Sequence, residues 1–570
     1  MVQHILRLRR AGAVERMTER IDRREFLRRV GLGAGATILA GCVPQTGQPG
    51  STAAAGASAE PLTLPIVKQP LSLSYWAPMS SNVSPTMKSF GEIACYRELE
   101  RRTGIHIEFQ HPPLGQETEQ FNLVAASGKY PDVLEYNWLT NAPGGPARFL
   151  RDGVIVRLND LIDRYAPNLK RVLSEHPEWR KMIVTDEGDI YAFPFIRGDP
   201  LLLVSVGLAI RQDWLDRLGL RTPATLEDWR GMLAAFKQRD PNGNGKADEI
   251  PLSTWAASPG AGTGARGAFS RYSFIGAWGI GQDWYQENGV MKFGPLQPEF
   301  REFLATMTQW YKDGLIDADV FATNQASFDA KMTNNQIGAA SMQGGNGIGK
   351  YAGLMAGKGT FKLSAAPNPT LRAGERPQLG GRDNPYPGQG SAAITSSNKS
   401  VVETVKMLDY AYSPEGSLLF NFGIEGTSYS MVNGLPTYLD AVMHDPKIPS
   451  AQMISRFARG NFNGPFVQDV RYITQYYELP EQKDALKVWT QPTNEKLLPP
   501  LTVTQDESKR FASLMTDINT RYDEVFNRVW SGKAGLDEWD GFARALRGMG
   551  IDDALKIQQA ALDRYNKRPS

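Results

Sequence analysis

The stretch DPNGNGKADEI, residues 240–250, concentrates carboxylates, carboxamides and glycines in a way that suits a cation site. Aligned with the calcium-binding loop of an EF-hand, it places oxygen donors at the first, third, fifth, seventh and ninth positions. Pro251 stands where an EF-hand carries its last, bidentate glutamate, so an earlier glutamate is the available substitute. The pattern predicts a structural Ca²⁺ bound by Asp240, Asn242, Asn244, the backbone carbonyl of Lys246, Asp248 and Glu249.

The competing interpretation of this loop is a polar turn without a metal. Asp and Asn side chains accept hydrogen bonds from their own backbone in such turns, and they follow helices often. Both interpretations give the loop the same structural place, because it would join a helix over 225–238 to the segment IPLSTW. A cation held entirely by protein oxygens leaves little room for catalysis.

A second group of residues combines aromatic rings with planar polar side chains, which suits a ligand with ring faces and hydroxyl groups such as a sugar. Sugar rings present apolar C–H faces that stack on aromatic rings, and their hydroxyl groups pair with planar polar side chains. For each aromatic residue, burial in the core is an equally good interpretation. The candidate ligand-binding residues, at ends of predicted strands and in irregular segments, are Trp76, Asn137, Trp138, Arg197, Trp255, Trp278, Trp284, Arg382, Asp383 and Tyr386. If the ligand carries a carboxylate, Arg197 and Arg382 are the arginines placed to bind it.

Catalytic patterns are weak by comparison. The histidines at 106, 111, 176 and 444 have neither metal-ligand nor triad spacing, and no acidic pair stands out at a strand end. The segment GGNGIGKY (344–351) resembles a phosphate-binding loop, but Tyr351 replaces the Ser or Thr that would bind magnesium. We therefore expect a binding protein that is not an enzyme. The alternatives are a secreted calcium-dependent glycan-degrading enzyme and a surface adhesin for glycans or peptides.

The elements that must position these residues alternate between strands and helices. LSLSYWAP (71–78) alternates as a strand, ACYRELERRTG (94–104) is typical of a helix ended by glycine, and IHIEF (105–109) is a second strand. This order predicts an α/β lobe with a largely parallel sheet, which binds ligands beyond the carboxyl ends of its strands. The helix over 225–238 begins with a capping box, and its Trp229, like Trp310 of a later helix, is expected in the core.

The first residues predict export and membrane attachment. Twin arginines at 23 and 24 precede an apolar run from Val30 to Ala40 that is too short to span a bilayer. The run ends in LAGC, which resembles a lipobox with Cys42 as the lipidated residue, so residues 1–41 are predicted to be a Tat-type lipoprotein signal peptide. Residues 42–69, rich in Gly, Ala and Ser at first, would form a flexible tether to the outer face of the cytoplasmic membrane.

Charge and cysteine content narrow the class further. Nine arginines and four acidic residues give the first 41 residues a net charge of +5, which leaves −3 on the remainder of a chain whose total is +2. A weakly acidic surface without a basic block argues against nucleic acid as a partner. Cys95 is the one cysteine besides Cys42, so no disulfide framework is expected.

Five segments together resemble a known family. From about residue 70 to the end, the chain is similar to the large extracellular solute-binding lipoproteins of ABC importers, in the branch that includes alginate-oligosaccharide-binding proteins. The segments are EGDIYAFPF (187–195), IRQDWLDRLGLRTPATLEDWRGMLAAF (210–236), WYKDGLIDADV (310–320), GIEGTSYSMVNG (423–434) and ALRGMGIDDALKIQQAALDRYNKR (545–568).

The resemblance implies a two-lobed α/β fold of the type II periplasmic-binding-protein kind, with a hinge that the chain crosses several times. It implies a first lobe of 70–203 plus 363–415 and a second lobe of 204–362 plus 416–570. It also implies that the protein captures an oligosaccharide, uronate-containing ones included, and delivers it to transmembrane permease subunits. Alginate-binding relatives hold calcium with the compact loop pattern above. We expect a monomer.

Overall fold

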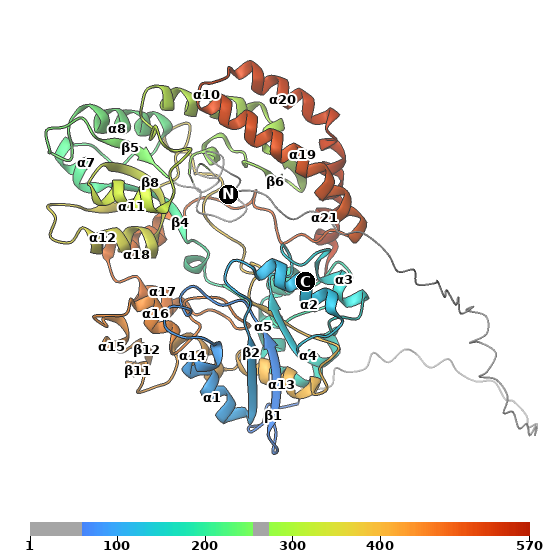
Figure 1. The fold of residues 1–570 in the computed structure, drawn as a ribbon. Coiled ribbons are helices and arrows are strands. Elements are labelled where there is room, and N and C mark those ends of the chain that lie inside the picture. The colour runs from blue at the N-terminus through green and yellow to red at the C-terminus, as the bar shows by residue number, and fades with distance from the viewer. Residues whose placement is uncertain (1–59, 255–268, 270–272, 570) are drawn as a thin grey trace, which may run out of the picture. The chain divides into compact units, whose positions relative to one another are not determined.

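The computed structural model describes residues 60–254, 269 and 273–569 (Figure 1). The predicted signal peptide, Cys42 and most of the predicted tether lie outside these described residues, as does Trp255. Across the described part of the chain, no helix is long and apolar enough to cross a membrane.

The first sheet has four strands in the order β10-β3-β1-β2. β1 is parallel to both β2 and β3, and β10 is antiparallel to β3. The sheet forms because alternating apolar residues of LSLSYW, such as Leu73 and Tyr75, enter the core. The largely parallel α/β lobe predicted from the sequence is therefore present. Its strands are β1 (Leu71–Trp76), β2 (Ile105–Gln110), β3 (Val133–Tyr136) and β10 (Ser391–Ile394).

Helices pack around this sheet and complete the first lobe. The predicted first helix is confirmed: it ends at Gly104, whose φ of 78° gives the left-handed turn that glycine adopts at least cost. Cys95 is fully buried in this helix. The helices are α1 (Ala94–Thr103), α2 (Glu117–Ser127), α3 (Gly145–Arg151), α4 (Asn159–Tyr165), α5 (Pro167–Glu175), α6 (Pro177–Ile183) and α13 (Val401–Tyr410).

The second sheet also has four strands, in the order β5-β8-β4-β9. β4 is antiparallel to both β8 and β9, whereas β5 is parallel to β8, so this sheet is mixed. The long apolar run over 201–210 enters the sheet only at Val206, after a short turn of 3₁₀-helix. The strands are β4 (Val206–Arg211), β5 (Ile250–Ser253), β8 (Ile337–Gln343) and β9 (Leu363–Ala366).

The second lobe is largely helical. The capping box of Thr225 and Asp228 is confirmed, and Trp229 and Trp310 are buried as predicted. A hairpin of β6 (Trp284–Glu287) and β7 (Val290–Phe293) lies beside α21. The helices are α7 (Gln212–Leu218), α8 (Leu226–Gln238), α10 (Pro298–Lys312), α11 (Gln325–Thr333), α12 (Lys350–Leu354), α18 (Pro480–Trp489), α19 (Gln505–Trp530), α20 (Leu536–Gly548) and α21 (Ile551–Lys567).

The lobe boundaries differ from the predicted ones in two places. β9 pairs with β4, so residues 363–366 belong to the second sheet and the chain returns to the first lobe later. Residues 416–478 pack on the first lobe, because the backbone amides of Ala94 and Cys95 donate to Arg456 and Phe457. This segment contains α14 (Pro414–Phe422), β11 (Tyr429–Val432), β12 (Leu435–Tyr438), α15 (Asp440–Met443), α16 (Ser450–Ser455) and α17 (Val470–Tyr476).

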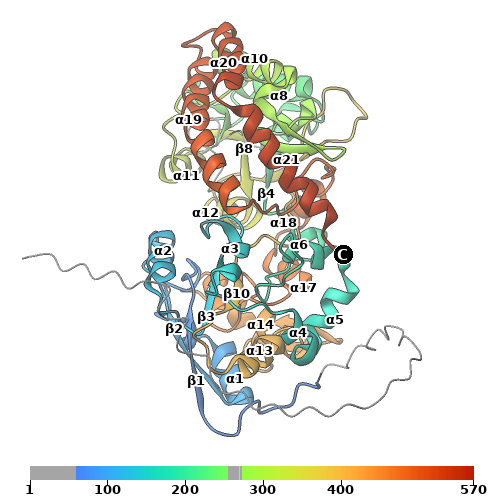
Figure 2. The same cartoon turned by 90° about the vertical axis from the view of Figure 1, so that its right-hand side faces the viewer.

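The last turn of α21 binds the first lobe through a group of hydrogen bonds and ion pairs that we call the clasp. Figure 2 shows the C-terminal end of this helix beside α6. Asp186 accepts hydrogen bonds from Arg564 at 2.7 Å and from Arg568, also at 2.7 Å at the closest. The side chain of Arg568 is fully buried, and Lys181 donates to the backbone carbonyl of Asn566 at 3.0 Å. The end of the chain is thus part of the connection between the lobes.

Candidate functional site

A cavity of about 390 Å³ lies at the carboxyl ends of β1 and β3. Residues 78–81 come after β1, residues 136–141 include the end of β3 and the loop after it, and residues 389–390 precede β10. Phe462 and Asn463, from the segment after α16, close the cavity from another direction. This is the edge at which open α/β sheets bind ligands, because the connecting loops diverge there.

A second cavity, of about 220 Å³, adjoins the first. Asn82 and Asn461 line it, and the residues next to them in the chain line the first cavity. Its other walls are the first crossing between the lobes (197–205), the end of β8 and the α17 region. We call the two cavities together the amide cleft.

Carboxamides and tyrosines dominate the polar lining of the amide cleft. A carboxamide offers a donor and an acceptor in one plane, and a phenol ring offers a flat face and a hydroxyl group. This combination suits a ligand that has many hydroxyl groups and apolar ring faces. The residues are Asn82, Asn137, Asn141, Gln343, Asn346, Gln389, Asn461, Asn463, Gln468, Tyr136, Tyr472, Tyr476 and Tyr477.

One charge of the amide cleft belongs to a buried ion pair. Glu135 of β3 receives two hydrogen bonds from Arg459, at 2.7 and 2.9 Å, and a third from the Tyr75 hydroxyl at 2.8 Å. Burial alone would lower the pKa of Arg459, but the Glu135 carboxylate outweighs it and the pKa is raised. Both side chains are almost wholly buried, so the pair anchors the segment that carries Asn461 and Asn463.

Arg197 and Asp383 join two crossings of the hinge. Arg197 donates to Asp383 at 3.4 Å and to the Leu202 carbonyl at 3.3 Å. Arg382 forms an isolated β-bridge with Val204 beside them. The guanidinium group of Arg197 reaches the amide cleft, but its two terminal nitrogens are already engaged within the hinge.

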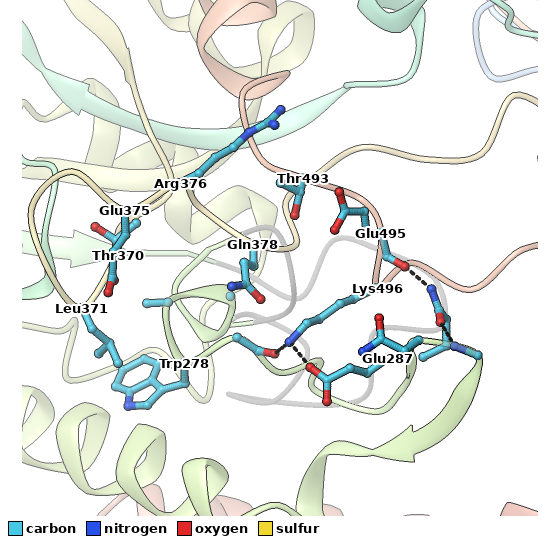
Figure 3. Close-up of a pocket in the computed structure, with 16 residues that line it drawn as sticks. Trp278, Glu287, Thr370, Leu371, Glu375, Arg376, Gln378, Thr493, Glu495 and Lys496 are labelled. Carbon is cyan, nitrogen blue, oxygen red and sulfur yellow. Dashed lines mark hydrogen bonds and ion pairs between the residues drawn. The ribbon is translucent and has the colours of Figure 1, made fainter.

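A larger pocket of about 980 Å³ lies within the second lobe (Figure 3). Trp278 lines it and remains 7% exposed. Lys496 forms an ion pair with Glu287, which Figure 3 shows, at 2.7 Å. Lys496 also donates to the Gly279 carbonyl. Arg376 donates to the Gln491 carbonyl at 3.0 Å, so both of these cations have partners.

The ten residues predicted to bind the ligand, as far as the structure describes them, lie at several separate places and do not form one site. Asn137 and Arg197 line the amide cleft, and Trp278 lines the second-lobe pocket. Trp284 is half-buried against Phe293 and Phe511 in the β6–β7 hairpin. Arg382 and Asp383 lie in the hinge, and Trp255 lies outside the described residues.

Three of the predicted aromatic residues lie inside the first lobe. Trp76 is 4% exposed and packs against Phe121 and Tyr136. Trp138 is fully buried and donates its indole N–H to the Ser391 carbonyl at 2.9 Å. Tyr386 is 1% exposed, and its hydroxyl lies 2.6 Å from that of Tyr191. These side chains offer no ring face to a ligand in this structure.

The tyrosines of the α17 region are absent from the set predicted from the sequence. Tyr476 and Tyr477 are adjacent at the end of a helix, a position typical of binding residues rather than of a buried helix face. The nearby segment RGNFNGPF, with two asparagines between glycines, is a further signal. The predicted lobe boundaries hide both signals. They assign residues 416–570 to the second lobe, so the tyrosines and the RGNFNGPF segment are not expected at the cleft edge of the first lobe.

The loop over 240–249 is a compact polar turn. The Asp240 carboxylate accepts hydrogen bonds from the backbone amides of Gly243, Asn244 and Gly245, at 3.0–3.1 Å. The side-chain amides of Asn242 and Asn244 donate to Asp248. Burial would raise the pKa of Asp248, but these amides outweigh it and lower that pKa. Hydrogen bonds within the loop therefore hold Asp240, Asn242, Asn244 and Asp248 together.

Glu249 is the exception to this satisfied network. Its Oε1 is buried and has no hydrogen-bond partner. Burial, followed by the nearby Asp240 and Asp248 charges, raises the pKa of Glu249. A buried carboxylate oxygen beside two carboxylates is the electrostatic environment that a cation relieves. Within residues 60–254, 269 and 273–569, no cluster of three or more His, Cys, Asp or Glu side chains suited to a metal was found, and the loop donors are partly amides and a carbonyl.

Comparison with known proteins gives the fold and the site a context. The family model of the bacterial extracellular solute-binding proteins matches residues 80–417. The fructooligosaccharide ABC transporter substrate-binding protein FusA of Streptococcus pneumoniae serotype 4 is 28% identical over 507 residues, which cover 85% of this chain and 89% of FusA.

Two solved structures extend the similarity to three dimensions. The alginate-binding protein AlgQ2, crystallised without calcium ion, is 26% identical, with a TM-score of 0.67 over 87% of this chain and 99% of AlgQ2. An EF-hand mutant of Streptococcus pneumoniae FusA in complex with fructo-nystose has the same identity, TM-score and coverage. The predicted two-lobed α/β fold is thereby confirmed.

Proposed function

Because the chain belongs to the bacterial extracellular solute-binding protein family, we propose that it captures an oligosaccharide outside the cytoplasm and delivers it to the permease subunits of an ABC importer. FusA is named as a fructooligosaccharide ABC transporter substrate-binding protein and AlgQ2 as an alginate-binding protein. The similarity to both supports an oligosaccharide as the ligand. The lipidated Cys42 would hold the protein at the outer face of the membrane, and the protein would act as a monomer.

The observation that carries this proposal is the lining of the amide cleft. Its carboxamides can pair with several sugar hydroxyl groups at once, and Tyr476, which is only half-buried, can stack on a ring face. Walls from both lobes contribute, since Asn82 belongs to the first lobe and Asn346 follows β8 of the second. A ligand bound there would touch both lobes and stabilise their closure.

Isothermal titration with a panel of oligosaccharides, followed by small-angle scattering of the complex, tests this function. We expect one or more oligosaccharides to bind with a Kd in the micromolar range or below and to reduce the radius of gyration. Chromatography of the ligand after overnight incubation should recover it intact. Release of shorter sugars would instead support a glycan-degrading enzyme. Binding without compaction would favour a surface adhesin.

We further propose that the loop over 240–249 holds a structural Ca²⁺. Asp240, Asn242, Asn244, the Lys246 carbonyl, Asp248 and Glu249 would be its ligands, and the unpartnered Oε1 of Glu249 supports this assignment. Bound calcium would lock the turn between α8 and β5. The residues fit because a hard cation takes several oxygens, both charged and neutral.

A further inference from the structure

The described lining of the amide cleft contains few charged side chains. Within its described lining the charged side chains are Arg197, Glu117 and Glu135. Every other polar side chain of that described lining is a carboxamide or carries a hydroxyl group. The cleft therefore differs from a site built for an anion, which needs cations or several convergent N–H donors.

Arg197, the cation of this described lining, donates from its two terminal nitrogens to groups of the hinge. Arg197 is bound to Asp383 and to the Leu202 carbonyl, and these contacts hold two crossings together. Using its terminal nitrogens for a ligand carboxylate would cost the ion pair with Asp383, although backbone hydrogen bonds would still join the crossings and the Nε of Arg197 has no hydrogen-bond partner. Arg471, at the start of α17, is likewise held by Asp469, with its nearest contact at 2.5 Å.

Of the two carboxylates of the lining, Glu117 disfavours an anionic ligand. Glu135 is neutralised by Arg459 beneath the cavity. Glu117, in the first turn of α2, accepts a hydrogen bond from the backbone amide of Gly115 at 2.8 Å, and no ion pair joins it to a described cation. A ligand carboxylate in this cavity would meet the charge of Glu117, and a low-dielectric cleft strengthens that repulsion.

The uncharged groups favour hydroxyl groups over carboxylates for a second reason. A carboxamide presents one acceptor and one donor group, and a sugar hydroxyl both donates and accepts, so each amide can be satisfied. A carboxylate only accepts, so it would leave unpaired those amide oxygens of the lining that lack an internal donor. Thr140 and Ser455 already donate to the oxygens of Asn137, Asn141 and Asn461. Unpaired polar atoms in a closed cleft are costly.

We propose that the amide cleft selects uncharged oligosaccharides and discriminates against uronates, with Glu117 as a residue that determines this specificity. The inference rests on the proposed function, since it names the class of sugar that the same cleft would take.

An oligosaccharide array tests the proposal if it carries neutral and uronate members of the same stereochemical series. Glucose with glucuronate, galactose with galacturonate and mannose with mannuronate oligomers form such pairs, to which neutral fructans and xylans are added. We expect the tightest ligand to be neutral and its uronate counterpart, where one exists, to bind at least about tenfold more weakly. A uronate oligomer that binds as tightly as every neutral one overturns the inference and leaves the proposed function standing. Binding of no oligosaccharide at all refutes the proposed function, and the inference with it.

A matched pair of variants on α2 separates the role of Glu117 from general charge effects. In Glu117→Lys, the ratio of the uronate Kd to the neutral Kd should fall at least about threefold. The ratio compares a neutral ligand with its uronate counterpart or, where none exists, the best neutral ligand with the best uronate ligand. Glu119→Lys changes the same charge on an exposed residue outside the lining, so it should leave the ratio unchanged. Equal ratios for Glu117→Lys and for the unmodified protein would show that Glu117 does not determine specificity.

Discussion

Replacement of Glu135 by glutamine should destabilise the first lobe strongly. Glu135 and Arg459 are 2% and 0% exposed, and the carboxylate receives three hydrogen bonds at 2.7–2.9 Å. Glutamine keeps the volume but removes the negative charge, and the NH₂ group that replaces one carboxylate oxygen cannot accept a hydrogen bond from Arg459. A buried cation without its partner costs about 3–5 kcal/mol of folding free energy. For a lobe of this size, that cost lowers the melting temperature by roughly 6 °C or more.

Urea unfolding followed by circular dichroism measures this cost, and two further variants show its origin. Glu135→Leu combined with Arg459→Met removes both charges and should recover most of the lost stability. Asp484→Asn removes one partner of an exposed pair, with Lys487, and should cost no more than about 1 kcal/mol. If Glu135→Gln cost no more than Asp484→Asn, burial of the pair would not be the source of its energy, and the reasoning would fail.

Three further predictions concern calcium, pH and the ligand. Chelation should lower the melting temperature, and calcium at about 100 times its Kd should restore about 2.7 kcal/mol; Asp240→Ala should abolish this response. Burial raises the pKa of Asp409, which caps α5 through Leu169, from 3.8 to about 6. The folded protein then holds the proton more tightly than the unfolded chain. This contribution to stability is full below about pH 4 and is lost as the pH rises through 6, a loss of ~3 kcal/mol. Asp409→Asn should remove that slope from unfolding curves measured at several pH values. Tyr476→Ala should weaken oligosaccharide binding about tenfold in calorimetry, with circular dichroism confirming that the variant is folded at the assay temperature; unchanged affinity would exclude Tyr476 from the site.

Local elements of the fold could be predicted because their signals are local. The alternation of LSLSYW, the capping box at Thr225 and the glycine at 104 each lie within a few residues of the element they define. The polar turn over 240–249 is equally local, because its hydrogen bonds join residues of the same loop. Periodicity and capping therefore suffice for these parts of the chain.

The ligand-binding residues could not be chosen in the same way. Trp138 stands at the end of a strand, as a binding residue would, yet its indole turns inward to a carbonyl 253 residues away. Tyr476 reaches the cleft because residues 416–478 pack on the first lobe, which no nearby residue reveals. The prediction places the return of the chain to the first lobe at residue 363, whereas β9 still pairs with β4 of the second sheet. The sequence of β9 is typical of a strand in either sheet, so it does not reveal which sheet the strand joins. Each of these outcomes depends on contacts between distant segments.

The clasp at the end of α21 has a consequence for how the molecule is made. Arg568 follows its partner Asp186 by 382 residues in the chain, so Asp186 is synthesised long before it. The N-terminal part of a chain folds first during synthesis, so the loop that carries Asp186 cannot make this contact until Arg564 and Arg568 have left the ribosome. The contact between the lobes that Asp186 makes is therefore completed only once α21 has been synthesised, and a chain truncated before Arg568 would lose part of it.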